Sequence, residues 1–460
     1  MNGKTLKIGM VLLVFLLVLS SFGGCFRRAV PPGVTPTSAP YTTRATQVTP
    51  PGNGTLTSAD QARLAMSKIR VAIVYDRISD GVVIGRSIDD VIGILDDTRT
   101  DLILKDFIRW EPVPDTATSA VPGYPANYAA GKAKIGYTYE QLADATNRIK
   151  AARPGTIIMG AISTQRLNNP EVNDLTGQAY PTDQAWAMAF DPAKFDLTGA
   201  LGSKEDVQCK AAKALGWVPS STTCPSGYSM ADAPAFFSDI TNPDYQDLLV
   251  DRAEKQIDLG ADAIWIDMLY AEAMAISEET KNPNHPGARA AVDAASAVID
   301  RIHAYGQSKG KYVPVGTWWT YVDLSYASPD LDFVTATPKS TEITGGLDGA
   351  GWDDIRRQVT GRSGNIPIIA VIDWGGSDGG VGAPLTVFSQ QLTGARQDEF
   401  ITSADAFFRG KGIIFAYPVH GGTFPTKSAR LAFGKYNVYD ALAPEFQTYG
   451  TIKQLAQAAG

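Results

Sequence analysis

Short apolar runs alternate with helical patterns over most of the chain that follows residue 67. This alternation is typical of a parallel sheet, because each strand is then buried on both faces and each helix on one. Eight runs predict strands: Ile69–Asp76, Leu102–Trp110, Thr156–Ser163, Ala263–Asp267, Val313–Trp318, Phe333–Thr337, Ile366–Asp373 and Ile413–Tyr417. Eight repeats favour a closed barrel over an open sheet, so the predicted fold is α/β, a (β/α)8 or TIM barrel.

Helical periodicity between the strands supports this fold. Asp244–Leu259 places four apolar residues near one face, and Gly260 follows where a helix usually stops. Ala288–Ser308 and Asp398–Phe408 repeat the pattern. Residues 165–238, between the third and fourth strands, are too many for a simple crossover. We expect them to form an insertion that roofs or flanks the barrel mouth.

The N-terminus has the pattern of an export signal. Lys4 and Lys7 precede an apolar run from Met10 to Leu19, which is too short to span a bilayer and ends in small residues. The Gly23-Gly24-Cys25 ending resembles the lipobox of prokaryotic lipoproteins, which implies lipidation of Cys25 and attachment to the outer face of the cell membrane. Cleavage nearby with free secretion, or a retained N-terminal anchor, are the alternatives.

Residues 26–67 are rich in Pro and Thr and have few large apolar side chains, so we expect a disordered linker between the signal peptide (residues 1–25) and the barrel domain (residues 68–460). Cys209 and Cys224 are the remaining cysteines, and both lie in the insertion. We expect them to form a disulfide, as an exported protein allows; two free thiols are the alternative.

The charge balance and the scarcity of histidine narrow the function. A net charge of −7 gives no basic footprint for nucleic acid. With three His in the chain we expect no metal site, and no nucleotide fingerprint, P-loop lysine or serine-hydrolase elbow is present, so we expect no cofactor.

Carboxylates end several predicted strands. Asp76, Asp267 and Asp373 close the first, fourth and seventh, and Glu111 follows the second. Because active sites of such barrels lie at the carboxyl ends of the strands, these acids should share one pocket, and crowded carboxylates supply an acid and a base. Glycoside hydrolysis needs such a pair. The alternative for each acid is capping of the following helix or an ion pair.

One stretch supports a carbohydrate reaction by resemblance. Asn242-Pro243 begins a helix, and Gly260-Ala261-Asp262 leads into a strand ending at Asp267. This resembles the strand-four region of TIM-barrel glycoside hydrolases, where the last Asp is catalytic. Acids on strands four and seven resemble the large clan of retaining glycosidases, although that clan has Glu at both positions. The resemblance implies a catalytic pair, with Asp267 as nucleophile or base and Asp373 as its partner. In the α-galactosidase type the partner lies on strand six, where only Glu342 is at hand.

Further residues at predicted strand ends are candidates for binding a sugar, because flat rings suit its apolar faces and polar groups suit its hydroxyls. They are Asp76, Trp110, Glu111, Tyr270, Glu272, Trp318, Trp319, Trp374, Tyr417 and His420. We therefore expect an extracellular glycoside hydrolase that cleaves a polysaccharide or oligosaccharide. A surface carbohydrate-binding or envelope protein on the same scaffold is the alternative. A phosphate-handling aldolase is a third, weakened because no lysine stands at a strand end.

Overall fold

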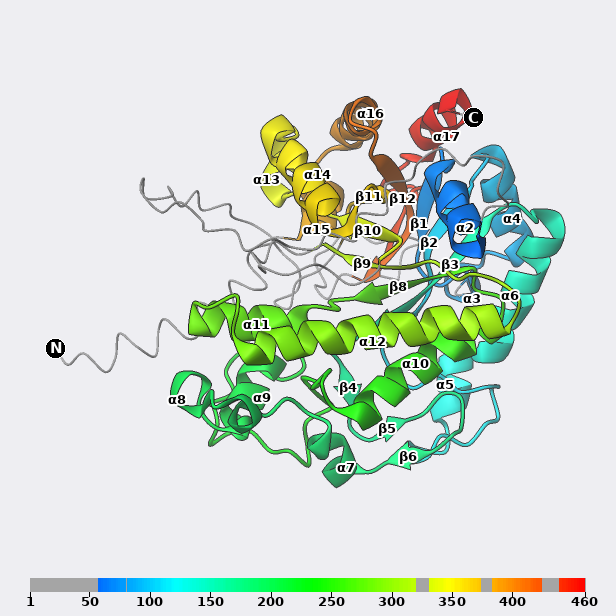
Figure 1. Cartoon of the computed structure of the whole chain (residues 1–460). Coiled ribbons are helices and arrows are strands. Elements are labelled where there is room, and N and C mark those ends of the chain that lie inside the picture. The colour runs from blue at the N-terminus through cyan, green and yellow to red at the C-terminus, as the bar shows by residue number, and fades with distance from the viewer. Residues whose placement is uncertain (1–56, 80, 320–330, 374–382, 424–437, 460) are drawn as a thin grey trace, which may run out of the picture.

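The computed structural model describes residues 57–79, 81–319, 331–373, 383–423 and 438–459. Eight parallel strands of this part of the chain close into a barrel, in the order in which they occur in the sequence (Figure 1). They are β1 (Ala72–Tyr75), β2 (Leu102–Arg109), β3 (Ile157–Ser163), β8 (Ala263–Asp267), β9 (Val315–Trp318), β10 (Phe333–Ala336), β11 (Ile368–Val371) and β12 (Ile414–Thr423). The first and last pair in parallel, with Ala72 opposite Ala416, which closes the ring. The fold is the predicted TIM barrel.

Helices cover the outside of the barrel, as the alternation of patterns predicts (Figure 1). They are α3 (Gly81–Ile84), α4 (Ile88–Asp97), α5 (Tyr128–Ala133), α6 (Tyr139–Ala152), α10 (Pro243–Asp258), α11 (Ala271–Thr280), α12 (Pro286–Ser308), α13 (Ser340–Gly345), α14 (Gly349–Ser363), α15 (Pro384–Thr386), the π-helix η2 (Val387–Gln391), α16 (Gly394–Gly410) and α17 (Tyr449–Ala459). The predicted helices match α10, α12 and α16. Asn242 is the N-cap residue of α10, and Pro243 is the first residue of the helix. Gly260 then follows with a φ of 104°, a conformation that glycine adopts readily.

The barrel interior is filled by alternate residues of the strands, with Trp265 and Phe333 as its largest side chains. Gly316 makes room for Phe333, because a Cβ there would lie 2.3 Å from its ring. At the amino ends of the strands the helix α2 (Ser58–Ser67) closes the floor, with Met66 buried in this interior cluster. The sequence assigned Ser58–Ser67 to the linker. That assignment is corrected, since a capping box at Thr57 starts the helix and Met66 gains burial by docking.

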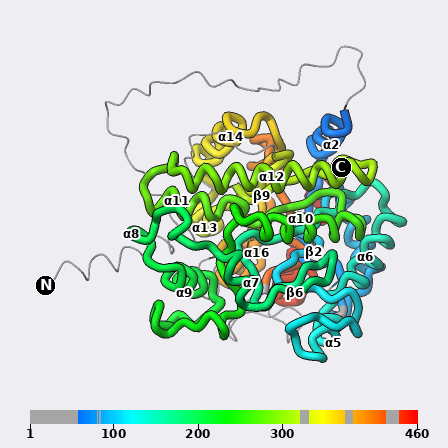
Figure 2. Tube along the Cα trace, turned by 60° about the horizontal axis from the view of Figure 1, so that its bottom comes forward, coloured from blue at the N-terminus to red at the C-terminus, as the bar shows by residue number. Residues whose placement is uncertain are grey.

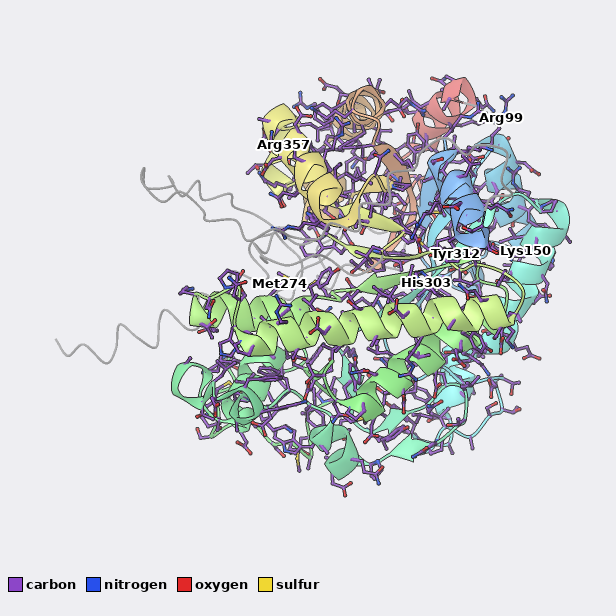
Figure 3. The ribbon with its side chains drawn as sticks, in the orientation of Figure 1. Arg99, Lys150, Met274, His303, Tyr312 and Arg357 are labelled. Carbon is purple, nitrogen blue, oxygen red and sulfur yellow. A yellow bond between two sulfur atoms is a disulfide. The ribbon has the colours of Figure 1, made fainter. Side chains whose placement is uncertain are left out.

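The carboxylate of Asp332 connects α2 to the amino ends of the barrel strands. Asp332, directly before β10, accepts hydrogen bonds from Arg63 of α2 at 3.0 Å and from Tyr312 at 2.9 Å. Its second oxygen lies 2.9 Å from Nε2 of His303, which Figure 3 shows beside Tyr312 at the end of α12. The helix α2 is thus held to the barrel by charge as well as by apolar contact.

The insertion, residues 165–238, forms a separate layer beside α10, α11 and α12, on the lower side of Figure 1 and in front in Figure 2. Its elements are β4 (Leu167–Asn168), β5 (Glu171–Val172), β6 (Ala179–Tyr180), α7 (Thr182–Ala187), the 3-10 helix η1 (Pro192–Phe195), α8 (Thr198–Leu201), α9 (Lys204–Ala214) and β7 (Ala235–Phe236). It flanks the mouth, because Gln165 reaches Asp267 at the end of β8. The Cys209–Cys224 disulfide is present, as predicted.

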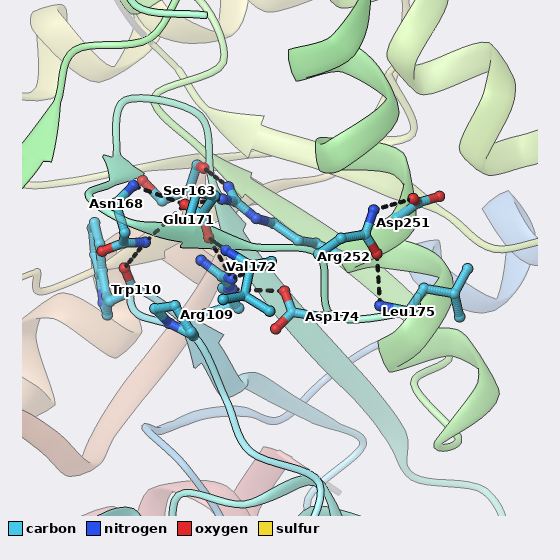
Figure 4. A network of polar contacts seen from close by, with 12 residues as sticks. Arg109, Trp110, Ser163, Asn168, Glu171, Val172, Asp174, Leu175, Asp251 and Arg252 are labelled. Carbon is cyan, nitrogen blue, oxygen red and sulfur yellow. Dashed lines mark hydrogen bonds and ion pairs between the residues drawn. The ribbon is translucent and has the colours of Figure 1, made fainter. Parts of the chain in front are cut away.

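A buried ionic network fastens this insertion to the barrel (Figure 4). Glu171 of β5 accepts hydrogen bonds from Arg109 of β2 at 2.8 Å and from Arg252 of α10 at 2.7 Å. Arg109 also donates to Asp174 at 2.7 Å. The side chains of Arg109, Glu171 and Arg252 are fully shielded from solvent. Since a buried charge is costly without its partner, these contacts fix where the insertion sits.

Candidate active site

Three carboxylates converge at the mouth of the barrel. Asp76 follows β1, Asp267 ends β8, and Asp373 lies two residues beyond β11. Side chains alternate along a strand, and each of these acids stands two positions after a residue that packs inside the barrel. Those residues are Val74, Trp265 and Val371. The carboxyl groups therefore lie inside the mouth, as the positions at the strand ends predict.

A lysine that the sequence analysis did not single out joins them. Lys105 lies within β2, where the pairing with β3 shifts register between Ile103 and Phe107. Its Nζ donates a hydrogen bond of 2.7 Å to Asp373 Oδ2 and lies 4.3 Å from the centre of the Trp265 ring. The signal available in the sequence, a lysine in the middle of a largely apolar run, was overlooked.

The four charges alter one another's protonation. Burial raises the pKa of Asp267 to about 7, with Lys105 opposing the rise and Asp373 adding to it. Burial likewise raises the pKa of Asp76 to about 6, against the opposing charge of Lys105. Burial alone would lower the pKa of Lys105, but the three surrounding carboxylates outweigh it and raise the value. The site thus combines a cation, a carboxylate paired with it and two carboxyl groups whose pKa values are raised to about 6 and about 7.

Backbone strain concentrates at the same place. Arg77, Lys105 and Met268 have φ values of 55°, 61° and 55°, a left-handed conformation that non-glycine residues rarely adopt. Each either follows one of the carboxylates directly or is the lysine itself. Strain of this kind persists where the surroundings impose it, and it is commonly found at active sites.

Thr164 and Gly421 fix the positions of two of the acids. The hydroxyl of Thr164 donates to the carbonyl oxygens of Asp267 and Met268, at 2.8 and 2.7 Å, and so holds the strained turn. On the other side, a Cβ at Gly421 would lie 2.6 Å from the Cβ of Asp76. Glycine at this position lets the end of β12 approach Asp76 closely.

Asp76 keeps an unsatisfied oxygen. Its Oδ2 accepts a long hydrogen bond of 3.4 Å from the backbone N–H of Gly422. Its Oδ1 is buried and has no hydrogen-bond partner among the described residues. Because a buried oxygen without a partner is costly, this atom is suited to a donor brought by a ligand, such as a sugar hydroxyl.

His420 lies next to Asp76, and its backbone carbonyl accepts the N–H of Asp76 at 2.9 Å. Its ring is buried, with Nδ1 2.6 Å from Asp440 of the short strand β13 (Val438–Asp440), which pairs antiparallel with β12. Asp440 also accepts two hydrogen bonds from Arg86. Burial raises the pKa of Asp440, but the hydrogen bond and charge of His420, followed by those of Arg86, hold it below the usual range. The sequence predicted His420 at the mouth but not this network.

The predicted aromatic platforms divide into two groups. Trp110 and Trp318 are partly exposed and pack against the interior cluster of the barrel, so they remain candidates. Tyr270, Trp319 and Tyr417 are buried, which corrects the expectation that their ring faces are open to a sugar. Tyr417, for example, donates to Asp405 of α16 at 2.6 Å, outside the barrel.

The three glutamates considered from the sequence lie away from the cluster. Glu111 forms ion pairs with Lys132 and Arg166 at the rim, and these lower its pKa against the effect of burial. Burial raises the pKa of Glu272 well above its ordinary value, and its Oε2 accepts the Ile240 N–H at 2.7 Å.

Glu342, within α13, accepts hydrogen bonds from the indole N–H of Trp352 at 3.0 Å and from the backbone N–H of Asp348 at 2.8 Å. Its contacts are therefore structural.

Two predicted residues lie outside the described part of the chain: Trp374 and Cys25. Within the described ranges no three His, Cys, Asp or Glu side chains form a cluster suited to a metal ion. Over the same ranges no helix has the length and apolar character needed to cross a membrane.

Comparisons with known proteins give a likeness of fold. No protein-family model matches the chain, and neither does any curated protein. Among solved structures, the glycoside hydrolase domain of PelA from Pseudomonas aeruginosa aligns at 12% identity over 76% of this chain and 94% of that one, with a TM-score of 0.34.

The maltogenic alpha-amylase AmyB from Thermotoga neapolitana aligns at 9% identity over 86% and 77% of the two chains, with a TM-score of 0.45. Amy13B from Eubacterium rectale aligns at 11% identity over 85% of this chain and 77% of that one, with a TM-score of 0.43. These identities and scores are too low to indicate an activity for this chain.

Proposed function

We propose that the chain is a glycoside hydrolase whose reaction takes place between Asp267 and Asp373. The observation that carries this proposal is the difference between two carboxyl groups at one barrel mouth: one is set to keep its proton and the other is paired with an ammonium. Hydrolysis of a glycosidic bond needs this division of roles.

In the proposed reaction Asp267 is the general acid. With a pKa of about 7 it holds a proton at neutral pH and passes it to the leaving glycosidic oxygen as the C–O bond breaks. Asp373, paired with the ammonium of Lys105, either attacks the anomeric carbon or takes a proton from the attacking water. This reverses the roles expected from the sequence, because burial favours the protonated form of Asp267.

Other groups of the site would position the sugar. The buried Oδ1 of Asp76 accepts a hydroxyl of the ring, and Trp110 and Trp318 offer apolar faces beside the mouth. Thr164 keeps the backbone of Asp267 in place, so the carboxyl group does not have to reorganise during the reaction.

A non-catalytic carbohydrate-binding protein is the second candidate, and the Lys105–Asp373 pair favours it. An ammonium 2.7 Å from the carboxylate competes with a sugar carbon or a water for the same oxygen. Under this reading the mouth binds glycans and turns none over.

The decisive measurement is hydrolysis of an oligosaccharide panel by the wild type, Asp267→Asn and Asp373→Asn, together with binding and thermal melts. Loss of acid–base function should lower the rate about 10²–10⁴-fold while binding survives. Asp293→Asn, an exposed change on α12, is the matched control. If the wild type binds glycans and cleaves none, the second candidate is correct. If both variants are folded and fully active, the site lies elsewhere.

We also propose that the protein is exported and held to the membrane by a lipid on Cys25, so that its partners are that membrane and an extracellular glycan. The lipobox-like ending supports the anchor, and the Cys209–Cys224 disulfide suits an oxidising location. Cys25→Ser should release the protein from the membrane fraction. Unchanged partitioning would contradict the lipid anchor.

A further inference from the structure

Two segments that follow neighbouring strands meet outside the carboxylate site. One is residues 110–127 with the helix α5 after it, and the other is the insertion, which follows β3. In a TIM barrel the segments that follow the strands build the rim of the mouth. Asn168 of the insertion donates to the backbone carbonyl of Trp110 at 3.2 Å, and Figure 4 shows the two residues side by side. The two segments are therefore joined at the rim.

Arg166 lies at the centre of this junction. Its guanidinium lies 5.6 Å from the centre of the Trp217 ring, its Nε donates to Asn168 at 3.0 Å, and its Nη2 lies 3.5 Å from Glu111. The bond from Nε is the only hydrogen bond that Arg166 makes within the described residues, although a guanidinium has five N–H donors. The group is thus held in place while it keeps donors that a ligand can use.

Trp217 comes from a later part of the insertion. It lies in the segment that the Cys209–Cys224 disulfide closes, and its backbone N–H donates to the carbonyl of Ala212 at 2.8 Å. The indole is partly exposed to solvent. Because the backbone is fixed by this closed segment and the ring by its contact with Arg166, binding of a ligand to the ring costs little conformational entropy.

Two tyrosines continue the same surface beyond Glu111. Glu111 pairs with Lys132, whose Nζ lies 5.1 Å from the centre of the Tyr128 ring, and that centre lies 4.3 Å from the centre of the Tyr124 ring. Each tyrosine hydroxyl donates to a backbone carbonyl, at 2.8 and 2.9 Å, so the edges of the rings are fixed. Both rings are partly exposed to solvent.

This surface begins at the candidate active site. Arg166 directly follows Gln165, whose Nε2 lies 3.5 Å from Asp267 Oδ2. Glu111 directly follows Trp110, which packs against the interior cluster of the barrel. A sugar chain that passes between the acids can therefore continue over Arg166 and Glu111 without leaving the protein.

The partly exposed residues of this surface are together called the distal subsite: Glu111, Tyr124, Tyr128, Arg166 and Trp217. We propose that the distal subsite binds sugar units remote from the bond at the carboxylates, so that the ligand is a polysaccharide held along its length. Flat rings suit the apolar faces of sugar rings, and guanidinium and carboxylate groups bond pairs of neighbouring hydroxyls. The inference rests on the proposed function in that the ligand is a glycan that also enters the mouth.

The test measures affinity as a function of chain length. Malto-, cello-, manno-, galacto- and chito-oligosaccharides of about two to about eight units are titrated into the full-length Asp267→Asn protein by calorimetry, so that no ligand is consumed. Once the chain is longer than the units that fill the mouth, each added contact is made within the same complex. We expect affinity to rise there by about tenfold, which is the contribution of one well-packed aromatic ring.

Variants in the Asp267→Asn background show whether this gain comes from the distal subsite. Trp217→Ala should lower the ratio of long-chain to short-chain affinity towards one, and Trp217→Phe, which keeps a flat ring, should retain most of the ratio. Trp186→Ala is the matched control and should leave the ratio unchanged. Trp186 is also a partly exposed residue of the insertion, on α7, and its ring lies 4.9 Å from Lys204 Nζ. Thermal melts establish that each variant is folded.

Three results would overturn the inference: a ratio near one in every series, no binding of any series, or a ratio that falls equally in Trp217→Ala and Trp186→Ala. Hydrolysis by the wild type is scored separately. A ratio that depends on Trp217 in a protein that cleaves nothing leaves the inference standing and defeats the proposed hydrolase. Cleavage by a protein whose affinity is the same for short and long chains does the reverse.

Discussion

The ammonium of Lys105 lies 2.7 Å from a carboxylate oxygen of Asp373, although 268 positions separate the two residues in the chain. The contact joins β2 to the end of β11 across the mouth, and Asp76 and Asp267 lie close enough to help raise the pKa of the same lysine against the effect of burial. The single positive charge of Lys105 thus lies near three carboxyl groups, and it cannot neutralise three negative charges. The remaining negative charge is relieved by protonation, and this gives the site a proton to donate near neutral pH.

The first prediction concerns pH. If Asp267 must be protonated to act, kcat/KM should be high below its pKa of about 7 and fall about tenfold per pH unit above it. Initial rates between pH 5 and pH 9, with melts to exclude unfolding, provide the measurement. A rate that keeps rising above pH 8 would show that Asp267 is not the proton donor.

Replacement of Lys105 by Met should shift the pH at which kcat/KM falls. Lys105 lowers the pKa of Asp267, so its removal should raise that pKa and shift the fall in kcat/KM to higher pH. The rate on the plateau should drop as well, because Asp373 loses its counterion. Lys150→Met is the control. That lysine pairs with Asp262, at the opposite end of β8, and Figure 3 labels it on α6. If kcat/KM of a folded Lys105→Met protein falls at the same pH as that of the wild type, the electrostatic account is wrong.

Glu171→Gln should be among the most destabilising changes away from the mouth. It leaves Arg109 and Arg252 buried with reduced compensation, which typically costs about 3–5 kcal/mol of unfolding free energy. Asp89→Asn, which breaks an exposed pair with Arg148, should cost less than about 1 kcal/mol. Urea unfolding of both variants gives the comparison, and equal midpoints would show that the network is not needed for stability.

The same carboxylate predicts how stability depends on pH. The charges of Arg109 and Arg252 outweigh burial and lower the pKa of Glu171 to about 2, from an ordinary value of 4.5. A folded-state pKa below the unfolded one gives stability that is present above about pH 4.5 and is lost as the pH falls towards 2. Melting temperatures of the wild type should fall over this window, and those of Glu171→Gln should fall less steeply. Parallel curves would contradict the prediction.

Loss of the disulfide should loosen the insertion. Cys209 and Cys224 are 15 positions apart, and on the chain-entropy model a loop of this size is worth about 3 kcal/mol. Cys209→Ser should therefore lower the melting temperature, and reductant should have the same effect on the wild type but none on the variant. Reaction of both cysteines with a thiol reagent in the absence of reductant would show that the bond is not formed in the protein.

The sequence predicted the barrel well because each strand is a nearly continuous apolar run. It also placed Asp267 and Asp373 at strand ends, because each of them directly follows such an apolar run. Lys105 was not identified, since alternation along a regular strand does not reveal a register shift that brings a residue inside. Tyr417 was misplaced for a related reason: its neighbour Ala416 faces the barrel interior, so Tyr417 faces the helices.

Two other elements, α2 and β13, were not predicted because their positions depend on contacts with residues distant in the sequence. The helix α2 has a capping box in its sequence, but its place under the barrel depends on Met66 and Arg63 finding partners far along the chain. The strand β13 is three residues long and is recognised only by its pairing with β12. Neither feature has a local pattern strong enough to distinguish it from a linker or a loop.

The pairing of β1 with β12 also has a kinetic consequence. Because the ring closes only when the first and last strands of the barrel meet, most of the chain must be ordered before the contact that completes it can form, and such distant contacts make folding slow. The backbone N–H of Asp76 bonds to the carbonyl of His420 across this junction. A partly synthesised chain therefore lacks an assembled mouth, and truncation of the chain before Ile414, which removes β12, should abolish ligand binding together with cooperative unfolding.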